Sequence, residues 1–527
     1  MRVTERLKAV FHRIDITPTG PVSLLGYFND RVSTGVLDPL ACRLAGFVVE
    51  PAIGGEPAAR RRRPALSSRR RAVRRARAAG AGTRRAGRAS ALDPVRRLLL
   101  LQIDTCLFDA GFAWALRRAL RARECGGWAE SEVLVFANHT HAAPALARLY
   151  EVPRQELYAA WLVNRIAAAA GQVARALAPA LPPACGRASP ELRAFPVSLA
   201  LARGRAAGLA FNRRWLTRDS RAVTNPSRAL RERLAGPEGP VDPQVDTLLF
   251  QDPAGKPAAL FVSVSNHTDT VGGEEVSADW TGVLEREVGR GLGLEVPVFP
   301  LLGAQGDVNH FDPDTRRDQT CYAETRRLGK AYAEAVLASL QAASPPALDP
   351  RSPSLASRVD RVLLPGRPIP REALAEARRL LSESAGGGGH GTLTAVELAA
   401  GAPEVKRVMA RELLRQAPVR RRAYRVPLQA VRLAGALLCA VPGELFAEVG
   451  LTLKASGGGQ RRAESSGLRA GAGAPALVLP LGLAGGYYGY ILPGERLRRG
   501  GYEALPVAGR LGGAASASIV GHFRRFC

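Results

Sequence analysis

The sequence lacks the features that mark membrane, secreted and disulfide-rich proteins. No apolar run reaches membrane-spanning length, because charged residues such as Asp104 and Arg165 interrupt the longest candidates. The N-terminus has no apolar core of a signal peptide. The seven cysteines are scattered, with no CxxC pair and no framework spacing. We therefore expect a cytoplasmic protein with free thiols and no transmembrane segment.

The signatures of several common enzyme classes are also missing. There is no HExxH, no P-loop, no GxSxG and no dinucleotide-binding GxGxxG after a strand. Zincins, P-loop NTPases and α/β-hydrolases therefore lose support. Any catalytic site has to be assembled from residues that lie far apart in the sequence.

Positive charge is abundant and concentrated in one stretch. The net charge is +27, and residues 60–88 contain 13 arginines and no acidic residue. The surrounding segment, 51–94, has few large apolar side chains, so we expect a disordered insertion. This stretch can bind nucleic acid or other anionic partners weakly and without sequence preference, because it lacks aromatic residues on which bases could stack. Genuine insertion and out-of-frame translation both remain open for 51–94, for the Gly/Arg-rich loop 457–474 and for 508–527.

Strand-like and helix-like segments alternate along the chain. Strands are predicted at 9–16, 44–50, 97–104, 133–137, 245–250, 258–265, 296–302, 359–364, 426–441 (one or two strands) and 476–483. Helices are predicted at 108–123, 151–181, 278–292, 316–342, 371–384, 395–416 and 446–454. The alternation predicts an α/β fold with mixed sheets flanked by helices, in a single domain over 1–527. Pro480 suits an edge strand better than a central one.

Polar residues suited to a site follow the ends of several predicted strands. They are Asn138 to His141, Asn266 to Asp269, Gly306 to Asn309, Pro442 to Glu444, and the tyrosines at 487, 488, 490 and 502. Loops beyond strand ends converge on one edge of a sheet, so these residues can meet.

Two of these segments carry the chemistry of a metal site. In an extended loop His139 and His141 would point the same way. Two histidines and a glutamate make a common hydrolytic zinc set. Structural alternatives stay open, since His267 suits a buried hydrogen-bonded position and Glu444 suits the first turn of a helix. The other histidines are not expected in the site: His12, His310, His390 and His522.

Taken together, the segments resemble the N-terminal catalytic domain of the neutral/alkaline, non-lysosomal ceramidase family. DITPTGPVSLLGY, GVLDPL, ANHTHAAP, NRR at 212–214, VSVSNHTD, GAQGDVN, VPGELF and GYYGYILPGERLRRGGYEA occur in the family's order over about residues 9–505. The resemblance implies the mixed α/β fold of that domain. The family's Ig-like C-terminal domain and secretion signal have no counterpart here.

The resemblance also assigns site residues. It implies zinc ligands at His139, His267, Glu444 and Tyr490. It places His141 beside the metal, Arg213 on the substrate side and Tyr502 as a second active-site tyrosine. The family's reactive serine falls on Asn309, where the sequence reads GDVN.

The function implied is that of a Zn²⁺-dependent hydrolase that cleaves the amide bond of a ceramide-like N-acyl lipid to a fatty acid and an amine. Asn309 has no ionisable group and is a poor nucleophile, so we expect water activated by zinc rather than an acyl-enzyme. Two alternatives remain: a metal-binding family member with a different substrate or no hydrolysis, and a nucleic-acid-binding protein acting through 60–88.

Overall fold

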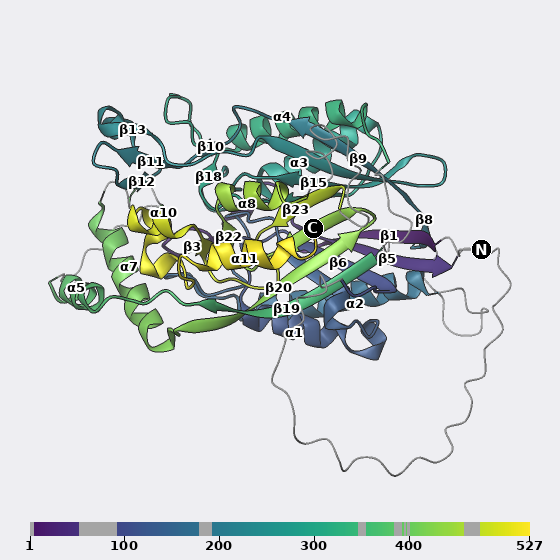
Figure 1. Ribbon diagram of the computed structural model, residues 1–527, viewed down its shortest axis with the longest axis horizontal. Coiled ribbons are helices and arrows are strands. Elements are labelled where there is room, and N and C mark those ends of the chain that lie inside the picture. Colours follow the sequence, from purple (N-terminus) through teal and green to yellow (C-terminus); the bar gives the residue numbers. More distant parts are fainter. Residues whose placement is uncertain are drawn as a thin grey trace, which may run out of the picture.

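The structure is a computed structural model that describes residues 5–51, 92–178, 192–345, 355–383, 393–394, 397, 401–457 and 475–527 (Figure 1). The expected insertion at 51–94 and the loop at 457–474 therefore fall almost wholly outside the described residues. No helix within the described ranges is long and apolar enough to cross a membrane.

Three β-sheets form the centre of the molecule (Figure 1). The first has the order β7-β6-β5-β1-β8 and comprises β1 (Glu5–Asp15), β5 (Ala41–Pro51), β6 (Arg97–Ile103), β7 (Val133–Ala137) and β8 (Phe195–Pro196). The second has the order β17-β15-β14-β9, with β9 (Ser198–Arg205), β14 (Gln244–Gln251), β15 (Pro257–Val264) and β17 (Val298–Leu302). The third has the order β19-β20-β21-β23, with β19 (Leu355–Pro365), β20 (Ala423–Leu433), β21 (Ala436–Ala440) and β23 (Leu477–Leu481).

Each sheet pairs most of its strands antiparallel and two of them parallel. The parallel pairs are β6–β7, β15–β17 and β21–β23. The sheets are therefore mixed, as the sequence predicted. Residues 426–441 form two strands, and β23, which contains Pro480, is an edge strand of its sheet, so the missing amide hydrogen interrupts no central ladder.

A central core lies where the three sheets face one another. It contains Phe47 and Phe136 of the first sheet, Phe261 and Phe299 of the second, and Leu438 of the third. The rings of Phe261 and Phe299 are 4.5 Å apart. The inner strands β6 and β21 are apolar on both faces, because their other face also packs in a buried core.

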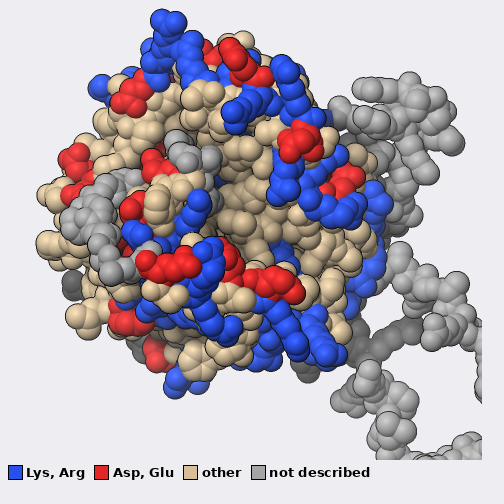
Figure 2. All heavy atoms as spheres, turned by 90° about the vertical axis from the view of Figure 1, so that its left-hand side faces the viewer, with Lys and Arg blue, Asp and Glu red and all other residues tan. Residues whose placement is uncertain are grey.

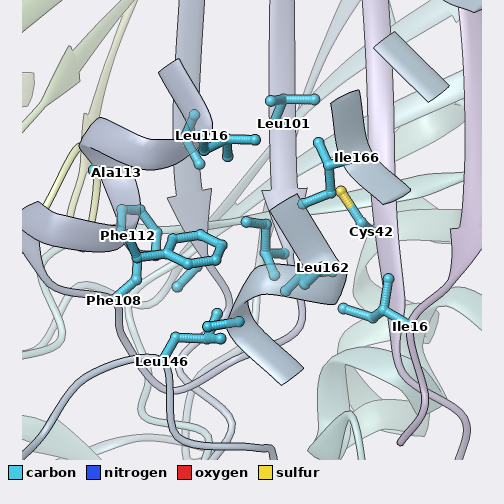
Figure 3. Packing of buried hydrophobic residues seen from close by; sticks show 14 of the residues in the cluster. Ile16, Cys42, Leu101, Phe108, Phe112, Ala113, Leu116, Leu146, Leu162 and Ile166 are labelled. Atoms are coloured by element: carbon cyan, nitrogen blue, oxygen red, sulfur yellow. The ribbon is translucent and has the colours of Figure 1, made fainter. Parts of the chain in front are cut away.

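Helices α1 (Ala110–Leu120) and α2 (Glu156–Leu177) cover the outer face of the first sheet (Figure 3). Phe112 and Leu116 of α1 and Leu162 and Ile166 of α2 pack with Leu101 of β6. Helix α1 begins after Asp109, whose side chain accepts a hydrogen bond from the Phe112 amide at 2.7 Å.

The other two sheets are covered in the same way. Helices α3 (Asp279–Leu292) and α4 (Tyr322–Leu340) pack on the second sheet through Trp280 and Tyr332. Helices α8 (Ala447–Lys454) and α11 (Ala515–Arg524) pack on the third through Leu453 and Phe523. Part of 508–527, a stretch for which the sequence left genuine insertion and out-of-frame translation open, is thus buried: Leu511, Ile519 and Phe523 belong to this core.

Helix α5 (Arg371–Ser382) and helix α7 (Pro403–Gln416) form a separate layer beside the sheets, and α10 (Gly494–Arg498) is short. The remaining strands are short: β2 (Ser23–Leu24), β3 (Arg31–Val32), β4 (Gly35–Val36), β10 (Phe211–Asn212), β11 (Arg214–Thr217), β12 (Ala222–Thr224), β13 (Leu234–Pro237), β16 (Glu275–Val276), β18 (Val308–Asn309), β22 (Glu444–Leu445) and β24 (Tyr490–Ile491).

Some predicted helix limits were wrong. Helix α2 begins at Glu156 rather than at 151, after Pro153, and two of its apolar residues face solvent: Leu157 is 90% exposed and Trp161 41%. The helix predicted at 316–342 begins only at Tyr322. The first part of the helix predicted at 395–416 lies mostly outside the described residues, and α7 begins with Pro403 at its first position.

Candidate metal centre and cavity

The carboxyl ends of strands from all three sheets meet at one place. Backbone hydrogen bonds tie the loops there together, from the Ala137 amide to the Leu483 carbonyl at 3.2 Å and from the Gly482 amide to the Leu302 carbonyl at 2.9 Å. The His141 amide likewise donates to the Thr268 carbonyl at 3.1 Å. The convergence expected from the sequence is therefore present in the fold.

Three of the expected ligands converge at this point. Glu444 Oε2 lies 3.4 Å from His139 Nε2 and 3.2 Å from His267 Nε2. All three residues are at most 2% exposed. A ligand atom from each lies within 4.8 Å of the other two, which suits a single bound cation. His139 and His267 come from the loops after β7 and β15, and Glu444 is the first residue of β22, which follows β21.

The hydrogen bonds of the two imidazoles orient their free nitrogens toward one point. His139 Nδ1 is 2.8 Å from the Cys106 carbonyl, and His267 Nδ1 is 2.8 Å from the Gln305 carbonyl. A carbonyl only accepts, so each Nδ1 carries the proton and each Nε2 keeps its lone pair. This outer hydrogen bond is the usual one for a metal-ligating histidine.

A second group of possible ligands overlaps the first. It consists of Cys106, His139 and His141, and the Cys106 Sγ lies 3.6 Å from His139 Nδ1. Because His139 Nδ1 already donates to the Cys106 carbonyl, this nitrogen is not available to a cation. The hydrogen bonding therefore favours the set of two histidines and Glu444.

The hydrogen bonds of the Glu444 carboxylate show whether a cation fits between the three side chains. Its Oε1 accepts a hydrogen bond from the Tyr487 hydroxyl at 2.7 Å, whereas Oε2 is buried without a hydrogen-bond partner in the described chain. A buried, unpartnered carboxylate oxygen beside two imidazole lone pairs suits a bound metal cation.

His139 and His141 do approach each other, although the loop is not extended. His139 has a φ of 63°, in the left-handed region, which turns the chain between the two rings. Their Nε2 atoms lie 3.5 Å apart. The His141 ring packs directly on Gly26, where a Cβ atom would lie 2.3 Å from His141 Cγ. Burial and the neighbouring His139 lower the pKa of His141, which keeps it neutral.

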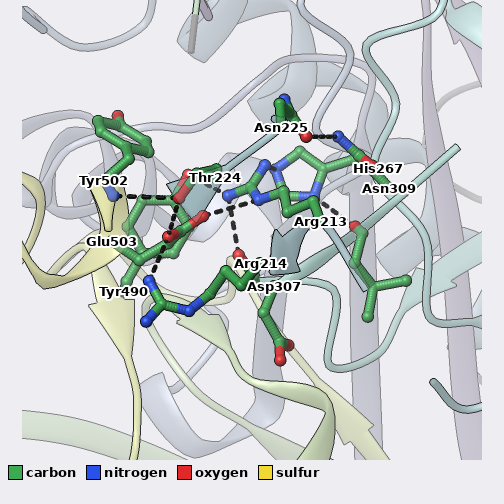
Figure 4. A network of polar contacts seen from close by, with 12 residues as sticks. Arg213, Arg214, Thr224, Asn225, His267, Asp307, Asn309, Tyr490, Tyr502 and Glu503 are labelled. Carbon is green, nitrogen blue, oxygen red and sulfur yellow. Dashed lines mark hydrogen bonds and ion pairs between the residues drawn. The ribbon is translucent and has the colours of Figure 1, made fainter. Parts of the chain in front are cut away.

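Arg213 connects the cluster to a buried network of charges (Figure 4). Its Nη1 is 3.1 Å from His267 Nε2, and its Nη2 donates to the Tyr490 hydroxyl at 3.0 Å. Its Nε donates to Glu503 at 2.8 Å, and Glu503 also accepts from Arg214 at 2.7 Å. The carboxylate therefore neutralises and orients Arg213.

The two remaining tyrosines of the expected site are close to this network. Tyr490 is held beside Glu444, because β22 and β24 pair in parallel with these two residues in register. The ring of Tyr502 lies 5.6 Å from that of Tyr490, and its hydroxyl is 2.5 Å from the Tyr150 hydroxyl.

Asn309 has a different position from the one expected of a reacting residue. It is fully buried, and it is not among the described residues that line a cavity of about 310 Å³ next to the cluster. Its Nδ2 donates to Asn225 Oδ1 at 3.0 Å, and Asn225 does line the cavity (Figure 4). The structure thus brings Asn309 near the site but behind another side chain.

A cavity of about 310 Å³ opens beside the cluster and is lined by His141, Arg213, His267, Tyr490 and Tyr502, among others. The face of the molecule that carries β11–β13, α5 and α7 is hollowed, with mostly uncharged atoms at the base of the hollow and both signs of charge around it (Figure 2).

Several contributors to the site were not singled out from the sequence. Glu503 lies next to Tyr502 in GGYEA, and this adjacency was the only signal for it. Cys106 was one scattered cysteine among seven, and Tyr150 carried no signal at all. Tyr487 was noted only as a member of a tyrosine cluster.

Fold and site together define a mixed α/β protein with a buried His-His-Glu cluster at the meeting point of three sheets. No protein-family model and no curated protein sequence matches the chain. Among solved structures, it is similar to a neutral ceramidase from Pseudomonas aeruginosa, with a TM-score of 0.61 and 17% identity over 99% of this chain and 74% of that one. It is also similar to a ceramidase complexed with C2, with a TM-score of 0.61 and 15% identity over 98% and 74% of the two chains. The chain has the neutral ceramidase fold, which confirms the fold expected from the resemblance.

Proposed function

We propose that the protein is a metal-dependent hydrolase that cleaves the amide bond of an N-acyl amine. Ceramide-like lipids are the first substrates to test, because the similar solved structures are ceramidases. The observation that carries the proposal is the unpartnered Glu444 Oε2, which faces two imidazole nitrogens beside a cavity.

Zinc is the metal that this donor set favours. His139, His267 and Glu444 would hold it, with Tyr490 as the fourth ligand. When bound, zinc supplies a Lewis acid that polarises a carbonyl and lowers the pKa of a water from about 15.7 to near 7.

Arg213 is suited to bind the substrate. The nitrogen of His267 that now accepts from Arg213 Nη1 is the one a metal would take, so metal binding frees this donor. Arg213 lines the cavity, and Glu503 keeps its orientation fixed. The freed Nη1 can then donate to the carbonyl oxygen of the amide, where negative charge develops.

Tyr502 and His141 are the candidates for proton transfer. Both line the cavity. Burial raises the pKa of Tyr502, so its hydroxyl stays protonated and can donate to the oxyanion. His141 is neutral, so it can accept a proton from the attacking water and then pass that proton to the leaving amine. Asn309 serves as a positioning residue for Asn225 and forms no covalent adduct.

The test is hydrolysis by the zinc-loaded protein of N-acylsphingosines of several chain lengths and of simple N-acyl amines. Mass spectrometry should detect the acid and the amine, with no acyl group attached to the protein. His139→Ala should abolish turnover, and His12→Ala, which changes a histidine on β1, should not. Absence of turnover with zinc bound would favour a family member that binds metal without hydrolysis. A covalent adduct on any Ser or Cys would refute direct attack by water.

Binding of nucleic acid through residues 60–88 stays a prediction, because these residues lie outside the described part of the chain.

A further inference from the structure

The cavity beside the cluster is small compared with a two-chain lipid. Its volume of about 310 Å³ equals roughly ten water molecules at about 30 Å³ each. This is the lower end of the range for small-molecule sites. A long-chain N-acylsphingosine has several times as many non-hydrogen atoms as such a space can hold.

The lining is also poorly suited to alkyl chains. Among the described residues that line the cavity, none is Leu, Ile, Val, Met or Ala. Among the described lining residues the large apolar side chains are aromatic rings, and three others, Arg213, Asp269 and Glu397, are ionisable. A compact, polar substrate fits this surface better than a hydrocarbon tail.

Asp269 is a buried acidic residue of the cavity lining. It is 7% exposed, its Oδ1 is the oxygen that pairs with His310, and its Oδ2 has no hydrogen bond or ion pair among the described residues. Its one charged contact is an ion pair with His310 Nδ1 at 3.3 Å, and His310 Nε2 is 2.6 Å from the Gln319 carbonyl. His310, which was not expected in the site, therefore supports Asp269 from behind.

The backbone fixes Asp269 close to the reacting centre. It follows the candidate ligand His267 by two residues, and the neighbouring Thr268 carbonyl accepts from the His141 amide. A donor on the substrate that reaches this carboxylate would hold the amide beside the cluster. Burial makes such a hydrogen bond selective, because a substrate without the donor would leave Asp269 Oδ2 unpaired.

We propose that the site selects a compact, polar N-acyl amine whose amine part carries a hydrogen-bond donor, a hydroxyl or an ammonium group, that binds Asp269. This inference rests on the proposed amide hydrolysis and narrows its substrate class. Arg213 and Asp269 then bind the two polar ends of the substrate, the carbonyl oxygen and the donor.

The experiment compares four amides with the zinc-loaded full chain: N-acetylethanolamine, mono-N-acetylethylenediamine, N-propylacetamide and N-hexadecanoylsphingosine in detergent. The first two carry a hydroxyl and an ammonium donor, and the third has the same length without a donor. We expect kcat/KM for at least one donor-bearing amide to exceed that for the other two by 10-fold or more. Asp269→Asn should reduce this preference to about twofold, chiefly through a change in KM. Comparison of the two donor-bearing amides shows whether the hydroxyl or the ammonium group is bound.

Two results would overturn the inference while leaving amide hydrolysis intact. One is faster turnover of the long-chain lipid than of both donor-bearing amides. The other is a preference for the donor that survives Asp269→Asn. If none of the four amides is hydrolysed, the proposed hydrolysis of such substrates is refuted, and calorimetric titration of the same amides then tests the subsite alone. Equal affinity of wild-type and Asp269→Asn protein for the donor-bearing amides would refute the proposed binding of the donor by Asp269.

Discussion

The hydroxyl of Tyr487 offers a clean perturbation of the metal centre. It donates at 2.7 Å to Glu444 Oε1, the oxygen that does not face the two histidines. Tyr487→Phe removes this one oxygen atom and leaves every proposed ligand in place. A hydrogen bond to a charged acceptor contributes about 1.5–3 kcal/mol, and loss of such an outer partner typically weakens metal affinity by about 10–100-fold. A tenfold change in affinity corresponds to about 1.4 kcal/mol, so the energy of the lost hydrogen bond and the expected loss of metal affinity agree.

Zinc affinity is measured by competition with a chromogenic chelator of known affinity. Tyr488→Phe is the matched control, since it deletes a hydroxyl from the neighbouring residue, whose ring packs against Tyr424. We expect Tyr487→Phe to bind zinc about 10–100-fold more weakly than wild type and Tyr488→Phe to bind it equally well. Unchanged affinity in Tyr487→Phe, with the protein folded, would show that Glu444 is not held for a metal.

Three further changes test the rest of the account. Asn309→Ala should lower kcat/KM by roughly 10–100-fold, at or below the cost of a lost oxyanion donor, with zinc content unchanged; complete loss of turnover would point to a direct chemical role. Phe523→Ala should lower the free energy of unfolding by about 3–5 kcal/mol in urea denaturation, against about 0.5 or less for exposed Arg524→Ala; equal effects would contradict the packing of α11. Burial and the nearby Arg525 lower the pKa of His522 to about 4, so the free energy of unfolding should fall as the pH drops from about 6.5 toward 4; if His522→Gln shows the same slope, another group is responsible.

The strands could be predicted from the sequence because the architecture buries both of their faces. In β6, Leu99 and Leu101 face the helices while Leu98 and Leu100 face the central core. An unbroken apolar run is the direct result. Helix limits were less predictable, since Pro153 displaces the start of α2 without interrupting the apolar pattern around it.

The candidate site was predictable where polar residues stand at strand ends, as at His139, His267 and Glu444. Its outer contacts were not predictable, because they join residues that lie far apart. Arg213 and Glu503 are separated by 290 positions, and no local pattern links them. The left-handed φ of His139 was equally invisible, since it depends on the loops packed around it.

The most direct test of the central claim is the metal content of the purified protein by inductively coupled plasma mass spectrometry. The account predicts about one zinc per chain, as in other three- and four-ligand sites. His139→Ala and His267→Ala should each lose the metal, and His12→Ala should retain it. Folded protein that stays free of zinc after supplementation, or that keeps one equivalent in both His139→Ala and His267→Ala, would contradict the assignment of this cluster as a metal centre.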